Sequence, residues 1–527
     1  MTTHVEVRGG QYIDSVSLMQ VSAAVAGGPG VSRANVAMAT ELNLDLLAGM
    51  GFEIPAEASP NDLVVAIEAE DDDAVAAALA QVEAQIAAIG QAGSGAGSFS
   101  GEPAPRSAGW AVRRTGAPLT VVSVPGPHAY VQAAGALAEG SSVMIFSDNV
   151  PIEQEIALKD LAAERDLLVM GPDCGTAVVG GVGLGFANHL ARGPVGVAAA
   201  SGTGAQHLTS LLHTAGVGIS HCLGLGGRDL SELVAGRSAR AALAALDADE
   251  QTEVIVLVSK PPHPGVAADL REFAAGLATP VLFALLGEGQ PTITEAAEAV
   301  LDHLDRPVPQ WPVWSPPAAE PAAGQPDGQS ATRSDGQPAE RRAAQPDAQP
   351  TGQPGLLRGL FAGGTLCDEA MIVAGESLGP IHSNIPLHPD LALPADLRHD
   401  GHLMVDFGDD ELTQGRPHPM IDGGLRLARI AEEAADPRTR VILLDVVLGY
   451  SAHENPAGEL APALEAALAT ARADGRRLDV VVSLCGTDAD PQGLHRQAET
   501  LRDAGAVVHT SNAAAARFAA DLVKEGA

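Results

Sequence analysis

The sequence predicts a multidomain α/β protein built on parallel sheets. From residue 119 onward, short apolar strands alternate with helical segments of about a dozen residues, which is typical of parallel sheets covered by helices on both faces. The length of 527 residues suffices for three or four domains. Hydrophobic residues make up 46% but aromatics only 3%, so the cores must be built from Ala, Val, Leu and Ile.

The first 92 residues predict a small α/β unit with a split βαβ arrangement. Residues 3–8, 31–40 and 61–70 read as strands, and residues 12–26 have helical spacing. Three aspartates at 71–73 open the next helix, where they favour the positive end of the helix dipole. Residues 93–108, rich in Gly and Ser, are expected to be a flexible tether.

The regular alternation fills residues 109–304. A change of pattern near residue 190 divides this part into two domains, 109–190 and 191–304. The predicted strands are 119–124, 141–147, 166–171, 195–201, 252–259 and 279–287, and the predicted helices are 128–139, 151–164, 204–214, 237–247, 265–276 and 292–304.

Residues 305–354 consist mainly of Pro, Gly, Gln and Ala without periodicity, which predicts a disordered linker. Residues 355–527 resume the alternation and predict another doubly wound domain. The stretches "VAAASGTGAQHL" (197–208) and "LFAGGTLCDEAM" (360–371) both lead from a strand through Gly and Thr into a helix. This likeness favours an internal duplication.

Charge and composition exclude several classes of partner. The formal net charge is −35, whereas nucleic acids and anionic membranes need a basic surface. A small anionic ligand remains compatible, because backbone amides bind anions without side-chain charge. The polar N-terminus, the lack of a long apolar run and four scattered cysteines predict a cytoplasmic protein with reduced thiols.

The two glycine turns are the strongest chemical signal. The first amides of a helix have no partner within the helix, and glycines let the backbone approach a ligand. We expect an anion or phosphate at these turns, although each is also compatible with an ordinary turn in which Ser or Thr caps the helix. The residues concerned are Ser201, Gly202, Thr203 and Gly204 in the first turn and Gly363, Gly364 and Thr365 in the second.

Further polar groups follow other predicted strands. Lys260 ends a buried strand, where it would fix a carboxylate or phosphate or remain a solvated loop residue. Cys174 is interpreted as a packed thiol, because no His-Asp pattern accompanies it. No metal is predicted, since the spacing of the remaining strand-end groups fits no standard site; these groups are His418, Asp422, His453 and Glu454.

These stretches together resemble a known family. Residues 124–179, with "VPGPHAYV" and "MGPDCGTAVV", resemble the CoA-binding domain of succinyl-CoA synthetase α subunits, and residues 193–227 resemble the ligase domain that follows it. "LFAGGTLCDEAM", "MVDFGDD" and "VVSLCGTD" resemble the C-terminal ligase domain of the β subunit. An α-like half joined to a β-like domain behind a short N-terminal unit is the layout of the FdrA family.

The resemblance implies a Rossmann-like CoA-binding domain at 109–190 and two flavodoxin-like ligase domains, α-type at 191–304 and β-type at 355–527. It makes CoA a candidate cofactor, with binding residues Pro125, Asn149, Pro151 and Asp173. The first Rossmann strand and its glycine turn are not evident, however, which weakens the case for CoA.

The departures bear on function. The loop after residue 287 lacks the phosphohistidine of the synthetases, Lys260 stands where they have a supporting glutamate, and the ATP-grasp domain is absent. Three functions stay open: an acyl-CoA synthetase-like protein that binds CoA- or phosphate-type ligands, a subunit of an oxamate carbamoyltransferase in purine (allantoin) catabolism, and a non-catalytic sensor or scaffold. In each, the expected partner is a small anion, with other subunits or a homo-oligomer as further candidates.

Overall fold

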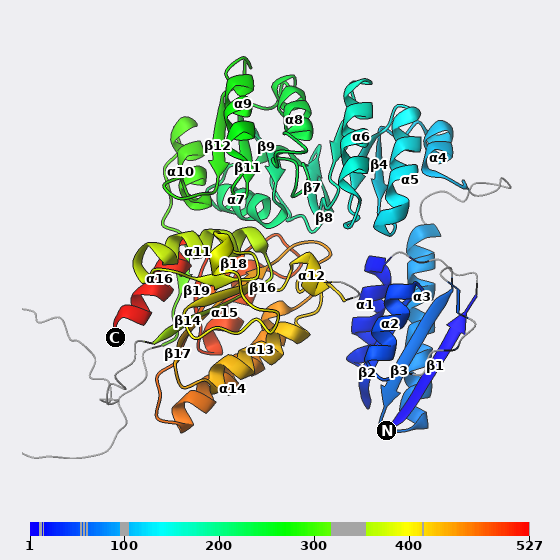
Figure 1. Cartoon of the computed structure of the whole chain (residues 1–527), viewed down its shortest axis with the longest axis vertical. Coiled ribbons are helices and arrows are strands. Elements are labelled where there is room, and N and C mark those ends of the chain that lie inside the picture. Colours follow the sequence, from blue (N-terminus) through cyan, green and yellow to red (C-terminus); the bar gives the residue numbers. More distant parts are fainter. Residues whose placement is uncertain are drawn as a thin grey trace, which may run out of the picture.

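The computed structural model describes residues 1–9, 13, 15–52, 55, 58–59, 62–94, 105–317, 355–413 and 416–525. The described chain forms four sheets with helices on their faces, which confirms the predicted multidomain α/β class. Figure 1 shows the N-terminal unit beside the C-terminal one, with the two middle units above them. Among the described helices, none is both apolar enough and long enough to cross a bilayer.

The N-terminal unit is a three-stranded antiparallel sheet in the order β1-β3-β2. Alternate residues of the central strand point to opposite faces, so Leu63, Val65 and Ile67 pack under α1 and α3, whereas Val64 and Ala66 pack with Leu47 of α2. The elements are β1 (Thr2–Arg8), α1 (Ser15–Ala26), β2 (Val31–Met38), α2 (Glu41–Gly49), β3 (Leu63–Ala69) and α3 (Asp72–Ser94). Of the predicted tether, residues 95–104 lie outside the described part.

The next unit has a short parallel sheet in the order β4-β5-β6. Its β4 is an edge strand, and Val121 on it is 52% exposed. The elements are α4 (Ala108–Thr115), β4 (Leu119–Val122), α5 (Gly126–Ala138), β5 (Ser142–Ile145), α6 (Ile152–Ala163) and β6 (Val169–Met170).

The glycine-rich stretch after β6 differs from our expectation of a simple crossing. It folds into a hairpin of β7 (Thr176–Val179) and β8 (Val182–Gly185), turned by Gly180 and Gly181 at positive φ. Strand β7 then pairs antiparallel with β10 (Ile219–Gly224), so the hairpin extends the following sheet. The domain boundary at residue 190 stays a prediction, although these residues hydrogen-bond across it.

The six-stranded sheet has the order β12-β11-β9-β10-β7-β8. Strand β9 lies centrally and pairs in parallel with β10 and β11, so that Val197 is opposite both Cys222 and Val256. Its elements beyond the hairpin are β9 (Val195–Ala200), α7 (Gly202–Thr214), β10 (Ile219–Gly224), α8 (Arg237–Asp247), β11 (Val254–Ser259), α9 (Pro264–Ala274), β12 (Val281–Leu285) and α10 (Ile293–His303).

The seven-stranded sheet has the order β13-β19-β18-β17-β14-β16-β15. Its elements are β13 (Val313–Trp314), β14 (Leu356–Phe361), α11 (Gly364–Leu378), β15 (His382–Ser383), the 3-10 turn η1 (Pro389–Leu391), β16 (Leu403–Asp406), α12 (Asp410–Thr413), α13 (Gly424–Ala435), β17 (Thr439–Val447), α14 (Pro456–Ala473), β18 (Asp479–Cys485), α15 (Leu494–Asp503), β19 (Val507–His509) and α16 (Asn512–Glu525).

The start of this sheet corrects the linker prediction. Residues 305–354 were expected to lack structure, but Val313 and Trp314 pair antiparallel with His509 and Val508. Trp314 also packs against the buried cluster that contains Leu360, Ile442 and Leu464. A large aromatic side chain can be buried in this way even when the segment around it is rich in proline. Residues 318–354 lie outside the described part.

Both large sheets share one topology. Leaving out the two-residue strands β13 and β15 and the hairpin, the first strand of each sheet lies between the second and the third, and the fourth follows the third. The orders are β10-β9-β11-β12 in one sheet and β16-β14-β17-β18 in the other. This is the doubly wound 2-1-3-4 order, in which the loops after the first and third strands diverge at a switch point. The predicted duplication therefore gains a topological parallel, and both predicted glycine turns follow a first strand.

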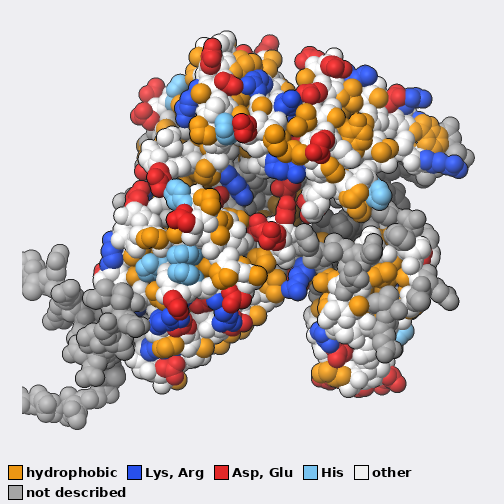
Figure 2. Space-filling model, viewed as in Figure 1, with side chains coloured by type: hydrophobic (Ala, Val, Ile, Leu, Met, Phe, Trp, Pro, Cys, Tyr) orange, Lys and Arg blue, Asp and Glu red, His pale blue; other side chains and the backbone are white. Residues whose placement is uncertain are grey.

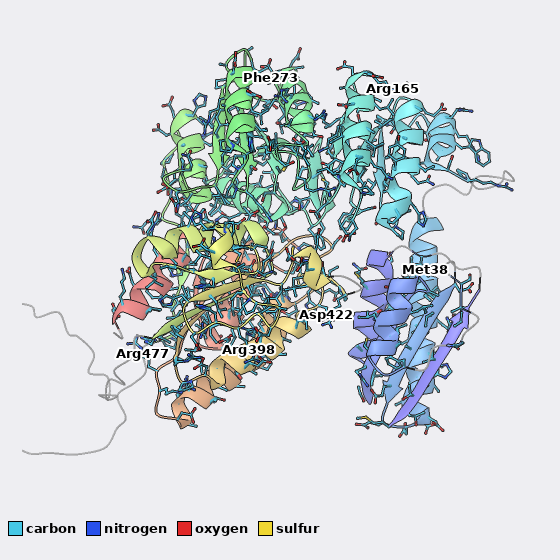
Figure 3. All side chains as sticks on the ribbon, viewed as in Figure 1. Met38, Arg165, Phe273, Arg398, Asp422 and Arg477 are labelled. Carbon is cyan, nitrogen blue, oxygen red and sulfur yellow. The ribbon has the colours of Figure 1, made fainter. Side chains whose placement is uncertain are left out.

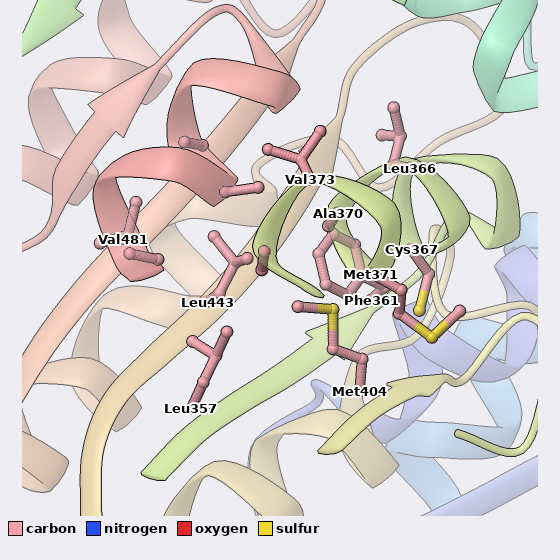
Figure 4. Close-up of a cluster of buried hydrophobic side chains, with 14 of the residues drawn as sticks. Leu357, Phe361, Leu366, Cys367, Ala370, Met371, Val373, Met404, Leu443 and Val481 are labelled. Atoms are coloured by element: carbon pink, nitrogen blue, oxygen red, sulfur yellow. The ribbon is translucent and has the colours of Figure 1, made fainter. Parts of the chain in front are cut away.

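The buried cores lie on both faces of the large sheets and are mainly aliphatic. Figure 4 shows the cluster between α11 and the seven-stranded sheet, to which the strands contribute Leu357, Phe361, Met404 and Leu443 and the helix contributes Met371. At about 25 cal/mol per Å² of buried apolar area, such clusters supply most of the stabilisation of a fold.

A buried polar network joins the two large sheets directly. The backbone N–H of Asn512 on α16 donates to Nε2 of His207 on α7 (3.3 Å), and Asn512 Nδ2 donates to Glu369 on α11 (2.7 Å). Glu369 also accepts the backbone N–H of Ile293 at the start of α10 (2.6 Å). Asp490 accepts from the side chain of Asn188 (2.8 Å). The two ligase-like units are therefore fixed to each other independently of the linker.

Candidate functional site

The two predicted glycine turns lie against each other in the structure. Ser201 Oγ and Thr365 Oγ1 are hydrogen-bonded at 2.6 Å, and both residues are buried. A Cβ atom on Gly363 would lie 2.8 Å from Thr203 Cγ2, so the side chain of Thr203 packs too closely on Gly363 for a larger residue there. The N-termini of α7 and α11 therefore meet, and their positive dipole ends face one shared space.

Only part of each predicted turn is available to a ligand. Ser201 caps α7 and accepts the N–H of Gly204 at 2.9 Å, as in the ordinary cap that we kept as an alternative. Gly363 N–H is likewise bonded to Asp445 at 2.8 Å. Among the described residues nothing accepts the amides of Gly202, Thr203, Gly364 and Thr365.

Asp445 holds the second turn in place. This fully buried aspartate of β17 accepts the backbone N–H of Ala362 (2.7 Å) and of Gly363 (2.8 Å), and Arg426 donates to it at 2.8 Å. The turn is therefore anchored to the neighbouring strand before any ligand arrives. Such preorganisation keeps the remaining amides directed at one point.

Lys260 projects from the end of β11 toward the N-terminus of α11. A Cβ atom on Gly364 would lie 2.9 Å from Lys260 Nζ and 2.6 Å from Asp406 Oδ2, so both charges crowd this glycine. Burial lowers the pKa of Lys260, but Asp368, Asp406 and Asp173 raise it by more, which keeps the ammonium charged. Among the described residues no hydrogen bond or ion pair occupies Nζ.

The other buried lysine of this half is in a different state. Lys159 Nζ donates to Glu155 (2.7 Å), to Asp229 (2.8 Å) and to the carbonyl of Leu225 (3.1 Å). Asp229 in turn accepts the first amides of α8, so this cluster ties α6 to α8. A lysine whose ammonium has three acceptors within the protein has a structural role. Lys260, by contrast, has no such acceptor among the described residues, so its N–H groups are available to a ligand.

Two carboxyl groups beside Lys260 were missed in the sequence. Burial raises the pKa of Asp406 at the end of β16 to about 7, and that of Asp368 on α11 to about 6, with Lys260 opposing each shift. Asp406 Oδ1 accepts the N–H of Gly408 at 2.9 Å. Groups that titrate near neutral pH within a cleft are suited to proton transfer. The motif "MVDFGDD" contained Asp406, but only the fold brings it to Lys260.

The ends of β4, β5 and β6 form the opposite wall. Pro125, Asn149 and Asp173 line the same cavity as the glycine turns, whereas Pro151 begins α6 and is not among the lining residues. Asn149 and Asp173 both have φ near +55°, at 52° and 55°, a conformation that Asn and Asp tolerate better than most residues. Asp173 is exposed to the cavity, yet the surrounding protein raises its pKa to about 7 and Asp410 adds to the rise.

One cavity of about 760 Å³ is lined by Lys260, Asp406 and most residues of the two glycine turns, together with Pro125, Asn149 and Asp173. Asp368 lies beside Lys260 but is not among the lining residues. The N-terminal unit forms part of its wall through Met19, Asn35 and Met38, and Met19 also packs against the core cluster of the C-terminal unit. Figure 3 places Met38 on the N-terminal unit and Asp422 on the C-terminal unit beside it. In Figure 2, acidic and basic side chains gather together where the upper and lower parts of the molecule meet.

The remaining strand-end residues behave as follows. Cys174 is buried, and burial raises the pKa of its thiol, which confirms a packed thiol. Within the described ranges no three His, Cys, Asp or Glu side chains are grouped as metal ligands. His418 lines the cavity, whereas His453 does not.

The raised pKa values predict the pH dependence of stability. A carboxyl group whose pKa is higher in the folded state stabilises the fold fully below its unfolded pKa, and this contribution is lost as pH rises through the folded pKa. We expect a higher melting temperature at pH 5.5 than at pH 8, and Asp406→Asn should raise the melting temperature at pH 8 by several degrees, at roughly 2–4 °C per kcal/mol. The exposed control Asp302→Asn should leave the pH profile unchanged, and an Asp406→Asn profile identical to the wild type would contradict the assignment.

Comparison with known proteins places these features in context. The family model described as CoA-ligase matches residues 360–522, and the model described as AllF, heavy metal-associated domain, matches residues 1–102. The protein YahF of Escherichia coli (strain K12) is 37% identical over 529 residues, covering 100% of this chain and 99% of YahF. The succinate–CoA ligase [ADP-forming] α subunit of Methanothermobacter thermautotrophicus is 26% identical over 159 residues, covering 30% of this chain and 51% of that subunit.

Among solved structures, the dinucleotide-forming acetyl-coenzyme A synthetase 1 of Ca. Korarchaeum cryptofilum, in complex with phosphate and ADP, is 13% identical. It covers 81% of this chain and 87% of its own, with a TM-score of 0.29. The heavy-metal name of the N-terminal model does not fit the residues present. Heavy metals prefer thiolate and imidazole ligands, but residues 1–102 contain no cysteine and only one histidine. That histidine, His4, lies with its Nε2 3.3 Å from Glu6 Oε2.

Proposed function

Because this chain belongs to the same family as YahF of Escherichia coli, with which it aligns from end to end, we propose that it is a CoA-ligase-like protein that binds an acyl phosphate at the paired glycine turns. The observation that carries this proposal is the meeting of two helix N-termini at Lys260, for whose ammonium the described part of the chain provides no partner. Four amides that no described residue accepts and one ammonium face one space, which suits a phosphoryl group. The finer assignment within this family is to the FdrA group.

The proposed chemistry is acyl transfer from phosphate. The acceptor attacks the acyl carbon and gives its proton to a nearby carboxylate, the acyl C–O bond to phosphate breaks, and inorganic phosphate leaves. Charge accumulates on the leaving phosphate, where the amides of Gly202 and Gly364 and the ammonium of Lys260 stabilise it. Asp406 and Asp368 titrate near neutral pH and are placed to take the proton.

CoA is the acceptor that the CoA-ligase resemblance favours. It would supply the thiol, and the turns after β4 and β5 would hold it. Neither Pro125 nor Pro151 gives its helix a side-chain cap. In α5 this leaves the N–H of Gly126, because Pro127 has no N–H and His128 donates to the carbonyl of Pro125 at 2.8 Å. In α6 it leaves the N–H groups of Ile152 and Glu153 for a diphosphate. The same cavity reaches from these turns to Lys260.

A second candidate is a subunit of an oxamate carbamoyltransferase, in which carbamoyl phosphate is the donor and oxamate the acceptor. One observation favours it: the segment 287–300 contains no histidine, which leaves no phosphohistidine for a synthetase cycle. In both candidates the partner subunits supply what this chain lacks.

Ligand-dependent melting tests these proposals. We expect inorganic phosphate and acetyl phosphate to stabilise the wild-type chain, with about 2.7 kcal/mol expected at a concentration of 100 times Kd. Stabilisation by CoA supports the ligase-like function, and stabilisation by carbamoyl phosphate without CoA supports the carbamoyltransferase. If none of these ligands shifts the melting temperature, the chain is a non-catalytic scaffold and the proposal is wrong.

A further inference from the structure

His418 lies in the cavity beside the carboxyl group of Asp406. A Cβ atom on Gly408 would lie 2.8 Å from His418 Nε2 and 3.2 Å from Asp406 Oδ1, so Gly408 leaves room for both side chains. The other oxygen of Asp406 and Lys260 Nζ both crowd Gly364 at the start of α11. A single carboxyl group therefore separates His418 from the proposed phosphate position.

Local hydrogen bonding fixes which ring nitrogen of His418 carries the proton. The backbone N–H of Met420 donates to His418 Nδ1 at 3.2 Å, so Nδ1 is an acceptor and carries no hydrogen. Burial lowers the pKa of His418 to about 4, which keeps the ring neutral at physiological pH. The proton is therefore on Nε2, and within the described part of the chain no acceptor is bonded to it.

The ring is also held in orientation. Phe186 lies 5.6 Å from it, centroid to centroid, and Phe186 itself packs 5.8 Å from Phe146 on the opposite wall. The Nε2–H of His418 is therefore a neutral donor with a fixed direction next to the proposed phosphate site. Such a donor matches an uncharged oxygen, such as a carbonyl, better than a second anion.

We infer that His418 is a substrate-binding residue whose Nε2–H donates to the carbonyl oxygen of the acyl or carbamoyl group while the attached phosphate occupies the glycine turns. This inference rests on the proposed function, because it takes the phosphate position from it. It adds a neutral donor that polarises the reacting carbonyl.

Two phosphonates that differ only in the carbonyl provide the test. Acetylphosphonate carries the carbonyl oxygen and ethylphosphonate does not, and both resist hydrolysis. By calorimetry we expect the wild-type chain to bind acetylphosphonate about tenfold more tightly, which corresponds to about 1.4 kcal/mol. His418→Phe keeps the ring packing on Phe186 but should abolish this preference, whereas the binding of ethylphosphonate and inorganic phosphate should not change. His418→Gln, which retains a donor, should recover part of the preference.

His453 provides a matched control. Its Nδ1 also accepts the N–H of the residue two positions later, Asn455 at 3.0 Å, but it does not line the cavity. His453→Phe should therefore leave the preference intact. Nitrogen-15 NMR should show the Nε2–H tautomer at His418 in the wild type.

The outcomes separate the two proposals. If His418→Phe weakens the binding of acetylphosphonate, ethylphosphonate and inorganic phosphate equally, the proposed role of His418 is wrong. An Nδ1–H tautomer in the wild type would also overturn it. Failure of the wild-type chain to bind inorganic phosphate overturns the proposed function itself.

Discussion

Replacing Lys260 by Met is expected to weaken the binding of inorganic phosphate by about 10- to 100-fold. A hydrogen bond to a charged partner contributes about 1.5–3 kcal/mol, and Lys260 is the ammonium placed at the paired helix N-termini. Because no described residue occupies Nζ, the substitution removes a ligand contact rather than a structural one. Calorimetric titration with phosphate measures the effect directly.

The fold should tolerate this change. Met retains the length of the side chain, and the loss of the ammonium leaves Asp406 and Asp368 with higher pKa values, so that they become neutral more readily. Lys260→Arg should keep most of the affinity, since it keeps the charge. Lys524→Met on α16, where Lys524 pairs with Asp521 at 2.8 Å, controls for net charge and should bind phosphate normally. Wild-type affinity in Lys260→Met would show that the ligand is not at β11.

Gly364→Ala is expected to abolish detectable phosphate binding in a protein that still folds. The added Cβ would lie 2.6 Å from Asp406 Oδ2 and 2.9 Å from Lys260 Nζ, closer than real Cβ contacts permit. Both side chains must move, and the new methyl group lies at the first amides of α11, where the phosphate is expected. Flexible side-chain ends can shift, so the melting temperature should fall only modestly.

The same helix supplies the matched control. Gly375 is also in α11, and a Cβ there meets nothing within 4 Å. Gly375→Ala should therefore stabilise the protein by about 0.5–1 kcal/mol through helix propensity and leave phosphate binding unchanged. Phosphate affinity retained by Gly364→Ala, or lost equally in both variants, would contradict the placement of the ligand.

Much of the architecture was predictable because buried parallel strands have a distinctive composition. The runs "VIVLVS" and "RVILLDVV" are apolar on both faces, and in the structure they are central strands covered by helices on either side. The glycine turns at 201–204 and 363–365 were found because each interrupts such a strand before a helix. The errors arose where local composition conflicts with tertiary pairing: the 176–185 hairpin and Val313–Trp314 both pair with strands distant in sequence.

The site was predictable only in part. Of the predicted residues outside the turns, those that line the cavity are Lys260, Pro125, Asn149 and Asp173. Within the turns, however, the N–H of Gly204 donates to Ser201 and that of Gly363 donates to Asp445, so neither is available to a ligand. Side chains from other elements, such as Asp445 on β17, decide which amides of a turn are left for a ligand. The sequence of the turn alone does not predict those contacts. Neither Asp368 nor Asp406 stands out in the sequence, and His418 stands out only as one of several strand-end groups, because Asp and His residues are common in loops and helices.

The sequence by itself determined the α/β class, the two apolar sheets and the glycine turns, since hydrophobic periodicity and backbone freedom are local properties. Only the tertiary structure decided that the two turns, separated by some 160 positions along the chain, meet through Ser201 and Thr365 and face Lys260, Asp406 and His418. The reason is physical: burial and the charges of neighbouring elements set pKa values, tautomers and hydrogen-bond partners, and they arise only when the domains pack together.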